Sequence, residues 1–220
     1  MNYFAHGRDH VDDPYFLAGT AVPDWLSVVD RKVRARSQRA APLMEDSDPR
    51  MAAVARGIVR HHRDDAWFHE TRAFGELCWR FTAAVRDALA LDDSLRPSFL
   101  GHILVELLLD DTLIHRDPVR LNRYYRAMAS VEPAVVEQVV NRISPRPTDR
   151  LGYFISLFCR ERFLWDYSED GKLLFRLNQV MDRVGLQPLP IEFQQVLPDA
   201  RKQVAERADE LLTANDKQTA

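Results

Sequence analysis

The sequence predicts an all-α protein, because three features of the chain favour helices. Only 8 of its 220 residues are glycine. Apolar residues recur at steps of three and four through most of the chain, as on one face of a helix. Five prolines follow charged residues at places that suit the first turn of a helix, where a missing N–H costs no hydrogen bond: Pro49, Pro97, Pro118, Pro133 and Pro147. Together these features predict a single-domain helical bundle.

Prolines and apolar spacing also predict the individual helices in order. Proline starts those at 49–66, 97–115, 118–129, 133–143 and 147–167, and apolar spacing defines those at 14–30, 68–90, 169–184 and 192–213. Gly185 is predicted to end the eighth helix, before Pro188-Leu189-Pro190. The stretch 31–48 is predicted to be a polar connection. We assign residues 1–212 to one helical domain and 213–220 to a disordered tail.

Composition narrows the class of protein. A mass of 25.4 kDa allows one domain with a substantial core. The formal net charge of -3 gives no reason to expect nucleic acid or an acidic membrane as a partner. Without an uncharged apolar run of about 18 residues we expect no membrane span, and without a signal peptide we expect a cytoplasmic protein. Cys78 and Cys159 lie in apolar helical patterns, so neither a disulfide framework nor a cysteine metal site is expected.

Two polar stripes stand out against this apolar pattern. In the strongly apolar stretch 101–111, His102, Glu106 and Asp110 lie four residues apart, on one side of the predicted helix. The stretch 60–69 repeats this spacing with His61, Asp65 and His69. Buried carboxylates need a metal ion, a cationic partner or a proton.

Two helices that present such stripes to each other can bind a metal ion in the core of a bundle. A purely structural alternative remains open. In that alternative, the histidines and acids form hydrogen-bonded networks or ion pairs within the core.

His6 and Asp24, near the N-terminus, are ambiguous when taken by themselves. A surface imidazole is the ordinary interpretation of His6, and a helix cap or turn residue after Pro23 is the ordinary interpretation of Asp24. Their surroundings are nevertheless part of a pattern. The chain carries, in order, Met1-Asn2-Tyr3-Phe4-Ala5-His6, Leu17-x-Gly19 with Asp24, Gly57-Ile58-x-x-His61-x-Arg63-x-Asp65, and Glu106-x-x-x-Asp110-Asp111-x-Leu113.

These blocks resemble, in the same order, the acyl carrier protein phosphodiesterases. That family is helical, is a divergent relative of the HD-type metal-dependent phosphohydrolases, and removes the phosphopantetheine arm from acyl carrier protein with a manganese-type cofactor. The chain departs from the family pattern at three positions: Glu106 replaces an aspartate, Asp111 a histidine and His62 an arginine. No match extends beyond about residue 130. A fainter likeness, through His6 and residues 17–24, is to zinc-dependent phospholipase C-like proteins.

The resemblance implies an HD-like fold and a metal ion surrounded by residues from these blocks. With the stripes, it leads to these predicted ligands: His6, His61, Asp65, His102, Glu106 and Asp110. Mixed imidazole and carboxylate ligands suit manganese or iron, with zinc as an alternative. Asp24 and Asp64 are predicted to be catalytic acids that orient water or protonate the leaving oxygen. The predicted phosphate-binding residues are Arg60, Arg63 and Arg8.

The expected function is hydrolysis of a phosphodiester or related phosphate ester, with acyl carrier protein as the partner that the resemblance implies. Two alternatives stay open. One is a helical binding or interaction protein without catalysis, and the other is a nucleotide phosphohydrolase.

Overall fold

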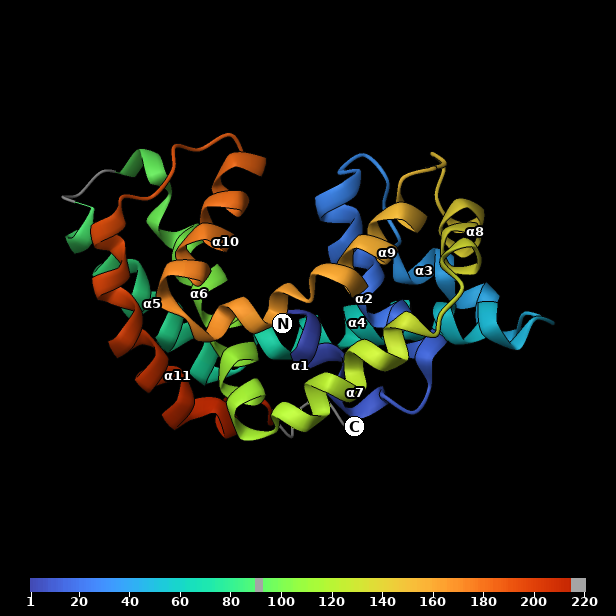
Figure 1. Cartoon of the computed structure of the whole chain (residues 1–220), viewed down its shortest axis with the longest axis horizontal. Helices are drawn as coiled ribbons and strands as arrows, with labels where there is room; N and C mark the ends of the chain where they lie inside the picture. Colours follow the sequence, from blue (N-terminus) through green and yellow to red (C-terminus); the bar gives the residue numbers. More distant parts are fainter. Residues whose placement is uncertain (90–92, 215–220) are drawn as a thin grey trace. The chain divides into compact units, whose positions relative to one another are not determined.

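The computed structural model describes residues 1–89 and 93–214, and all regular elements within these ranges are helices (Figure 1). The all-α prediction is therefore confirmed. Contacts gather in two compact units: the first unit is Asn2–Asp65 with Asp117–Phe163, and the second unit is Met1 with Ala66–Arg116 and Leu164–Ala220. The HD-like topology and the assignment of 1–212 to one domain stay predictions. Most of the predicted disordered tail, residues 215–220, lies outside the described residues.

The helices match most of the predicted ranges. Those of the first unit are α1 (Tyr3–Gly7), α2 (Pro14–Val29), α3 (Ser37–Ala40), α7 (Pro118–Ala129), α8 (Pro133–Ile143) and α9 (Leu151–Glu161). Those of the second unit are α5 (Arg72–Ala88), α6 (Pro97–Arg116), α10 (Asp170–Arg183) and α11 (Leu197–Leu211). Most of α4 (Pro49–His69) belongs to the first unit and its last turn to the second. Short 3₁₀ turns connect several of these helices.

Four of the five predicted proline starts are confirmed, and the one at Pro147 is wrong. Helix α9 begins only at Leu151. The side chain of Asn141 accepts a hydrogen bond from the Thr148 N–H (2.8 Å) and donates one to the Thr148 carbonyl (2.9 Å), which keeps this segment in a loop. Pro147 also disfavours the helical conformation of Arg146 before it.

Other helix ends differ from the sequence-based expectation or confirm it. Gly185, at φ 74°, ends α10 as predicted, and the N–H of Leu186 donates to the Met181 carbonyl (2.9 Å). The predicted helix 147–167 instead ends at Glu161, because Arg162 is left-handed at φ 50°. The predicted polar connection 31–48 contains α3 and a 3₁₀ turn, and α1 was not predicted at all.

Aromatic packing holds α1 in the core of the first unit. The ring of Tyr3 lies 5.2 Å from that of Phe158, and the ring of Phe4 lies 5.7 Å from that of Tyr124. Trp25 of α2, fully buried, packs against the same Phe158 at 5.3 Å. Burial of each such ring stabilises the fold by about 2 kcal/mol. The position of α1 fixes the position of His6, which is only 2% exposed.

Two glycines bring α2 and α4 together. A Cβ atom on Gly19 would lie 2.2 Å from the Val54 carbonyl oxygen, and one on Gly57 would lie 2.1 Å from that of Phe16. Only glycine leaves room for backbones this close. The close contact gives a physical reason for glycine at positions 19 and 57. It also brings His61, one turn after Gly57, against the backbone of α2.

The second unit is built on α5, α6 and α11, which pack on one another (Figure 1). A Cβ atom on Gly101 of α6 would lie 2.8 Å from Oγ1 of Thr82 and 2.9 Å from the Cys78 carbonyl oxygen, so α6 also depends on a glycine for its close contact with α5. Ion pairs add to the apolar core. Arg201 of α11 pairs with Asp111, and Arg207 pairs with Glu76 at 2.7 Å.

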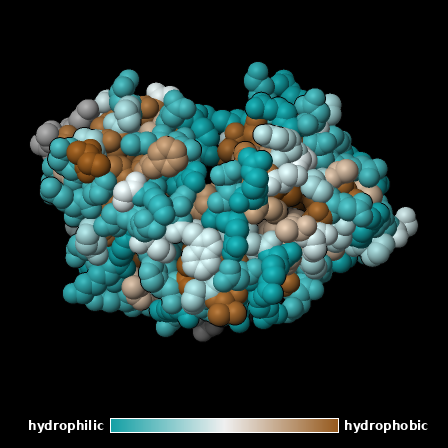
Figure 2. Space-filling view, in the orientation of Figure 1, coloured by the Kyte–Doolittle hydropathy of each residue, from teal (hydrophilic) through white to brown (hydrophobic). Residues whose placement is uncertain are grey.

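The outer faces of the helices are mainly polar. Figure 2 shows a largely hydrophilic face on which apolar residues form small separate patches. Among the residues that the structure describes, no helix combines the length and apolar character needed to cross a bilayer.

Candidate metal centre

Two groups of side chains in the described residues have the composition and spacing of metal ligands. The first group is His6, His61 and Asp65, and the second group is His69, His102 and Glu106. Within each group, one ligand atom from each residue lies within 4.8 Å of the others. The first group belongs to the first unit and the second group to the second unit.

In the first group, two imidazoles face the two oxygens of one carboxylate. Nε2 of His6 lies 3.2 Å from Oδ1 of Asp65, and Nε2 of His61 lies 3.3 Å from Oδ2. The two rings are stacked, with centroids 4.1 Å apart. His61 and Asp65 are four residues apart on α4, so they share a face, and α1 supplies His6.

A backbone hydrogen bond determines the tautomer of His61. Its Nδ1 lies 2.8 Å from the carbonyl oxygen of Thr20, which can only accept, so Nδ1 carries a proton and donates it. In the neutral ring, Nε2 then presents a lone pair to the Asp65 carboxylate. A backbone carbonyl that holds Nδ1–H and so leaves Nε2 for the ion is a usual support of a metal-ligating histidine.

His6 and Asp24 carry buried polar atoms that make no hydrogen bond. Both ring nitrogens of His6 are buried and make no well-aligned hydrogen bond, although Nε2 is within ion-pair distance of Asp65. Oδ2 of Asp24 is likewise buried without a hydrogen bond. Such atoms are costly unless something compensates them.

The pKa values reflect this concentration of buried charge. Burial raises the pKa of the Asp24 carboxyl, and the nearby imidazoles of His61 and His6 only partly offset it. Burial alone would raise the pKa of Asp65 as well, but the imidazoles of His6 and His61 bring it far below its ordinary value. The pKa of His61 is raised because the carboxylates of Asp24 and Asp65 outweigh its burial.

The predicted catalytic residue Asp64 lies on the Nδ1 side of the His6 ring, whereas Asp65 lies on the Nε2 side. Its Oδ2 is 3.9 Å from Nδ1 of His6, and the guanidinium Nε of Arg60 donates to both carboxylate oxygens at 2.7 and 2.8 Å. The side chain of Asp64 is buried, whereas that of Arg60 is 44% exposed. Asp64 therefore has the position of a group that orients His6, and Arg60 has the position of a group that holds Asp64.

The first group fits a divalent metal ion. Ligand atoms bonded to one ion at about 2.1 Å are about 3.0 to 3.4 Å apart. The separations of 3.2 and 3.3 Å, one from each imidazole to a different oxygen of Asp65, lie in that range, and one ligand atom from each residue lies within 4.8 Å of the others. The His6 nitrogens lack hydrogen bonds, and the His61 tautomer leaves Nε2 available for a metal. Two imidazoles and a carboxylate, without a thiolate, form a nitrogen and oxygen donor set.

The predicted phosphate-binding arginines are in three different situations. Arg60 holds Asp64, as described above. Arg8 makes an ion pair with its neighbour Asp9 at 3.3 Å, and Arg63 is exposed on α4. Their binding of phosphate stays a prediction.

In the second group, two imidazoles converge on a single carboxylate oxygen. Nε2 of His69 lies 3.0 Å from Oε1 of Glu106, and Nε2 of His102 lies 3.2 Å from the same atom. The α-ammonium of Met1 is also 3.1 Å from this oxygen. Burial alone would raise the pKa of Glu106. The Met1 ammonium and the imidazoles of His102 and His69 outweigh this effect and hold the pKa well below its ordinary value.

The structure thus divides the predicted stripes between the two groups. His61 and Asp65 join His6, whereas His69 joins His102 and Glu106. Each step of four residues turns about 40° around a helix, so the third member of a stripe points about 80° away from the first. The rotation follows from helix geometry, but only the tertiary structure shows which neighbouring side chains each end of a stripe meets.

Asp110 shows the same effect in α6. It is fully buried, whereas His102, two turns earlier, is 40% exposed at its side chain. Among the described residues Asp110 belongs to neither group, and its role as a metal ligand stays a prediction. The neighbouring Asp111 is a structural residue, because Arg201 and the hydroxyl of Ser168 (2.9 Å) both donate to its carboxylate.

Sequence reasoning overlooked two histidines. His69 was part of a stripe but not among the predicted ligands, and its position at the end of α4 becomes meaningful only beside α6. His10, four residues after His6, packs on Phe16 with ring centroids 4.5 Å apart. Its pKa is lowered, mainly by burial and by the nearby Arg60 cation. In the sequence, the four-residue spacing between His6 and His10 was the signal that could have drawn attention to His10.

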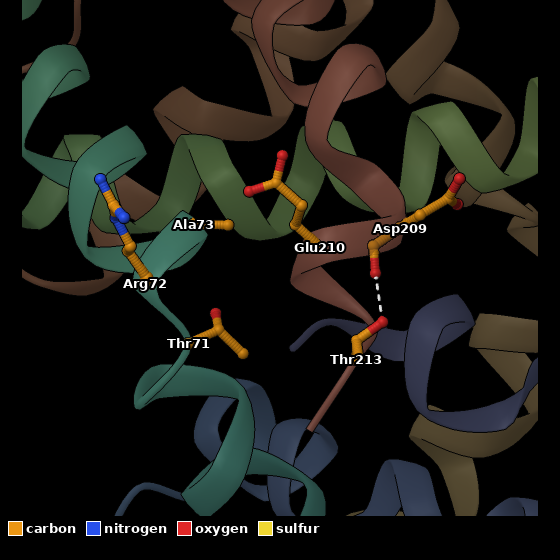
Figure 3. A pocket seen from close by; sticks show the side chains of 6 residues that line it. All are labelled: Thr71, Arg72, Ala73, Asp209, Glu210 and Thr213. Carbon is orange, nitrogen blue, oxygen red and sulfur yellow. Dashed lines mark hydrogen bonds between the residues drawn. The ribbon is translucent and has the colours of Figure 1, made fainter. Parts of the chain in front are cut away.

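A hollow in the second unit has no part in either group. Figure 3 shows it between the start of α5 and the end of α11, lined by Thr71, Arg72, Ala73, Asp209, Glu210 and Thr213. The Thr213 hydroxyl donates to the Asp209 carbonyl (2.7 Å), and no imidazole lines the hollow.

The geometry stands without support from known proteins. No family model, curated protein or solved structure matches the chain. The resemblance to the acyl carrier protein phosphodiesterases therefore rests on the quoted residues alone and stays a prediction.

Proposed function

We propose that this protein is a metal-dependent phosphodiesterase or phosphohydrolase whose metal ion is held by His6, His61 and Asp65. The observation that carries the proposal is the geometry of the two buried imidazoles and the partly exposed Asp65 carboxylate. Two stacked imidazoles point Nε2 at the two oxygens of one carboxylate, and the Thr20 carbonyl holds the proton of His61 on the opposite nitrogen. Manganese or iron suits this donor set best, with zinc as the alternative.

A divalent ion held there supplies a Lewis acid for a phosphoryl oxygen and lowers the pKa of water. The chain itself supplies proton transfer and positioning. Burial raises the pKa of Asp24 toward the range in which a carboxyl can accept a proton from water and return it to a leaving oxygen. Asp64, held by Arg60, orients His6, and the exposed Arg63 offers two parallel N–H donors to phosphate.

The proposed substrate class is a phosphodiester. The phosphopantetheine arm of acyl carrier protein is the member of that class that the resemblance implies, and a cytoplasmic location belongs to the same proposal. Neither follows from the metal-site geometry, so each needs its own experiment.

Metal analysis combined with hydrolysis tests the proposal. The protein is loaded with manganese, iron or zinc, dialysed and assayed on bis-p-nitrophenyl phosphate. We expect Asp65→Asn to lose one equivalent of metal and nearly all activity. The control Asp12→Asn, which alters an exposed carboxylate of the first unit, should retain both. Wild-type protein that binds no metal would instead favour a helical interaction protein whose histidines and acids form core networks.

Substrate experiments then separate the remaining possibilities. Release of phosphopantetheine from holo-acyl carrier protein, followed by mass spectrometry, tests the implied substrate. Stabilisation of the metal-loaded protein by nucleoside phosphates but not by acyl carrier protein would favour a nucleotide phosphohydrolase. Arg63→Ala should raise KM and leave the metal content unchanged, and loss of metal in this variant would contradict its assignment to phosphate.

A further inference from the structure

The second group has the donors of a metal site of its own. His102 and Glu106 are four residues apart on α6 and share a face, and His69 ends α4 beside them. The rings of His69 and His102 lie 4.9 Å apart and their Nε2 atoms approach one carboxylate oxygen at 3.0 and 3.2 Å. These separations again match those between donors of one ion.

An aromatic wall limits the freedom of both imidazoles. The ring of Phe74 lies 4.8 Å from that of His69 and 5.0 Å from that of His102, and Phe74 is only 6% exposed. Gly101, next to His102, allows α6 to pack directly on α5, the helix that carries Phe74. The two rings are therefore held together by packing before any ion binds, which lowers the cost of ordering them.

One side of the group is open to solvent. The side chains of His69 and His102 are 34% and 40% exposed, whereas that of Glu106 is only 15% exposed. Three protein donors with an open side leave at least one coordination position for water, as in zinc sites with three protein ligands. The first group differs, since His6 and His61 are almost completely buried.

The Glu106 carboxylate already attracts positive charge. The Met1 ammonium lies 3.1 Å from Oε1, the same oxygen that both imidazoles approach. An ion at this place would compete with the ammonium for that oxygen. Imidazole nitrogens bind a transition metal directly, whereas an ammonium offers them at most a hydrogen bond, so the paired histidines favour the metal.

We propose that His69, His102 and Glu106 form a second metal site, independent of the first group, that binds an exchangeable zinc ion. Its donors are the same in type as those of the first group, two nitrogens and one oxygen, but its open side leaves room for the water that completes a four-coordinate zinc ion. An ion bound there links the last turn of α4, which carries His69, to α6, which carries His102 and Glu106. Its role is to hold that turn, so its loss leaves the hydrolytic centre chemically intact.

Equilibrium dialysis against zinc, followed by elemental analysis, tests the proposal. We expect two equivalents in the wild type, one in His102→Gln, one in Asp65→Asn and none in the double variant. His115→Gln is the matched control, because His115 is an exposed histidine of the same helix outside the group, and it should keep both equivalents.

The outcomes separate this site from the proposed hydrolytic centre. If His102→Gln and His69→Gln both keep the wild-type zinc content, the second site does not exist and the group is an ion-pair cluster around Glu106. If Asp65→Asn keeps it while His102→Gln loses one equivalent, the first group fails and the second stands. Cobalt absorption provides a second readout, since cobalt bound at the second site should lose its visible bands in His69→Gln but not in His115→Gln.

Discussion

Replacement of Gly57 by alanine should distort the first histidine–carboxylate group without altering any of its side chains. A Cβ atom at this position would lie 2.1 Å from the Phe16 carbonyl oxygen and 2.8 Å from both Gly19 Cα and Thr20 N. Ordinary contact begins at 3.4 Å, so α2 and α4 must separate by on the order of 1 Å. All three atoms are backbone atoms and cannot rotate away.

The expected loss of stability follows from two opposing effects. Overpacking against backbone costs about 3 kcal/mol, the upper part of the usual range, whereas alanine in place of glycine within a helix returns about 1 kcal/mol. The net loss of about 2 kcal/mol corresponds to a fall in Tm of about 4 to 8 °C for a chain of this size. Separation of the helices also breaks the 2.8 Å hydrogen bond from His61 to Thr20, so metal affinity should fall about 10- to 100-fold.

Thermal unfolding by circular dichroism, with metal removed and with metal added, measures both effects. Gly152→Ala is the control, because its Cβ atom would lie 3.7 Å from the nearest atom, Oε2 of Glu137, which is ordinary contact. It should change stability by less than about 1 kcal/mol and leave metal binding unchanged. If Gly57→Ala unfolds at the same temperature as this control and binds metal as tightly, the helix crossing does not position His61.

Three further predictions concern titration and positioning. The pKa of Asp24 is higher in the folded protein than in the unfolded chain, so stability falls as pH rises above its ordinary value of 3.8. Asp24→Asn should therefore stabilise metal-free protein at pH 7 but not at pH 3, as measured by urea unfolding. Equal gains in stability at both pH values would exclude ionisation of Asp24 as the cause. The same variant should abolish hydrolysis. Burial raises the pKa of Cys78 to about 12 and that of Cys159 to about 11, from 9.0. At pH 8 iodoacetamide should thus alkylate Cys78 about 1,000-fold and Cys159 about 100-fold more slowly than a free thiol, until urea exposes both. Rapid labelling of the folded protein would contradict this. Arg60→Ala, which removes the guanidinium that binds Asp64, should lower the hydrolytic rate about 10-fold with no loss of metal, and an unchanged rate would show that Arg60 does not position this residue.

Local signals in the sequence were sufficient for most of the helices. Prolines at positions 49, 97, 118 and 133 and the apolar spacing act within a few residues, so their effects can be read without the fold. Pro147 failed as a start because Asn141 binds Thr148 across a loop, a contact that depends on the end of α8. Nothing in the sequence marks Arg162 as a residue with a left-handed backbone conformation.

The candidate ligands were also visible in the sequence, but their grouping was not. His6 looked like a surface residue, and only the packing of Tyr3 and Phe4 explains why it is buried against His61. The spacing of His61, Asp65 and His69 indicated one stripe, yet the rotation of about 40° per four residues separates its ends.

The sequence by itself determined the helical class, most helix boundaries and the residue types able to bind a metal, because these depend on interactions between near neighbours. Tertiary structure alone decided that the histidines and acids form two groups, that Thr20 sets the tautomer of His61, and that Arg60 holds Asp64 behind His6. Helix packing determines which faces meet, and the contact of Gly19 with Gly57 shows that the decisive distance is one between backbones.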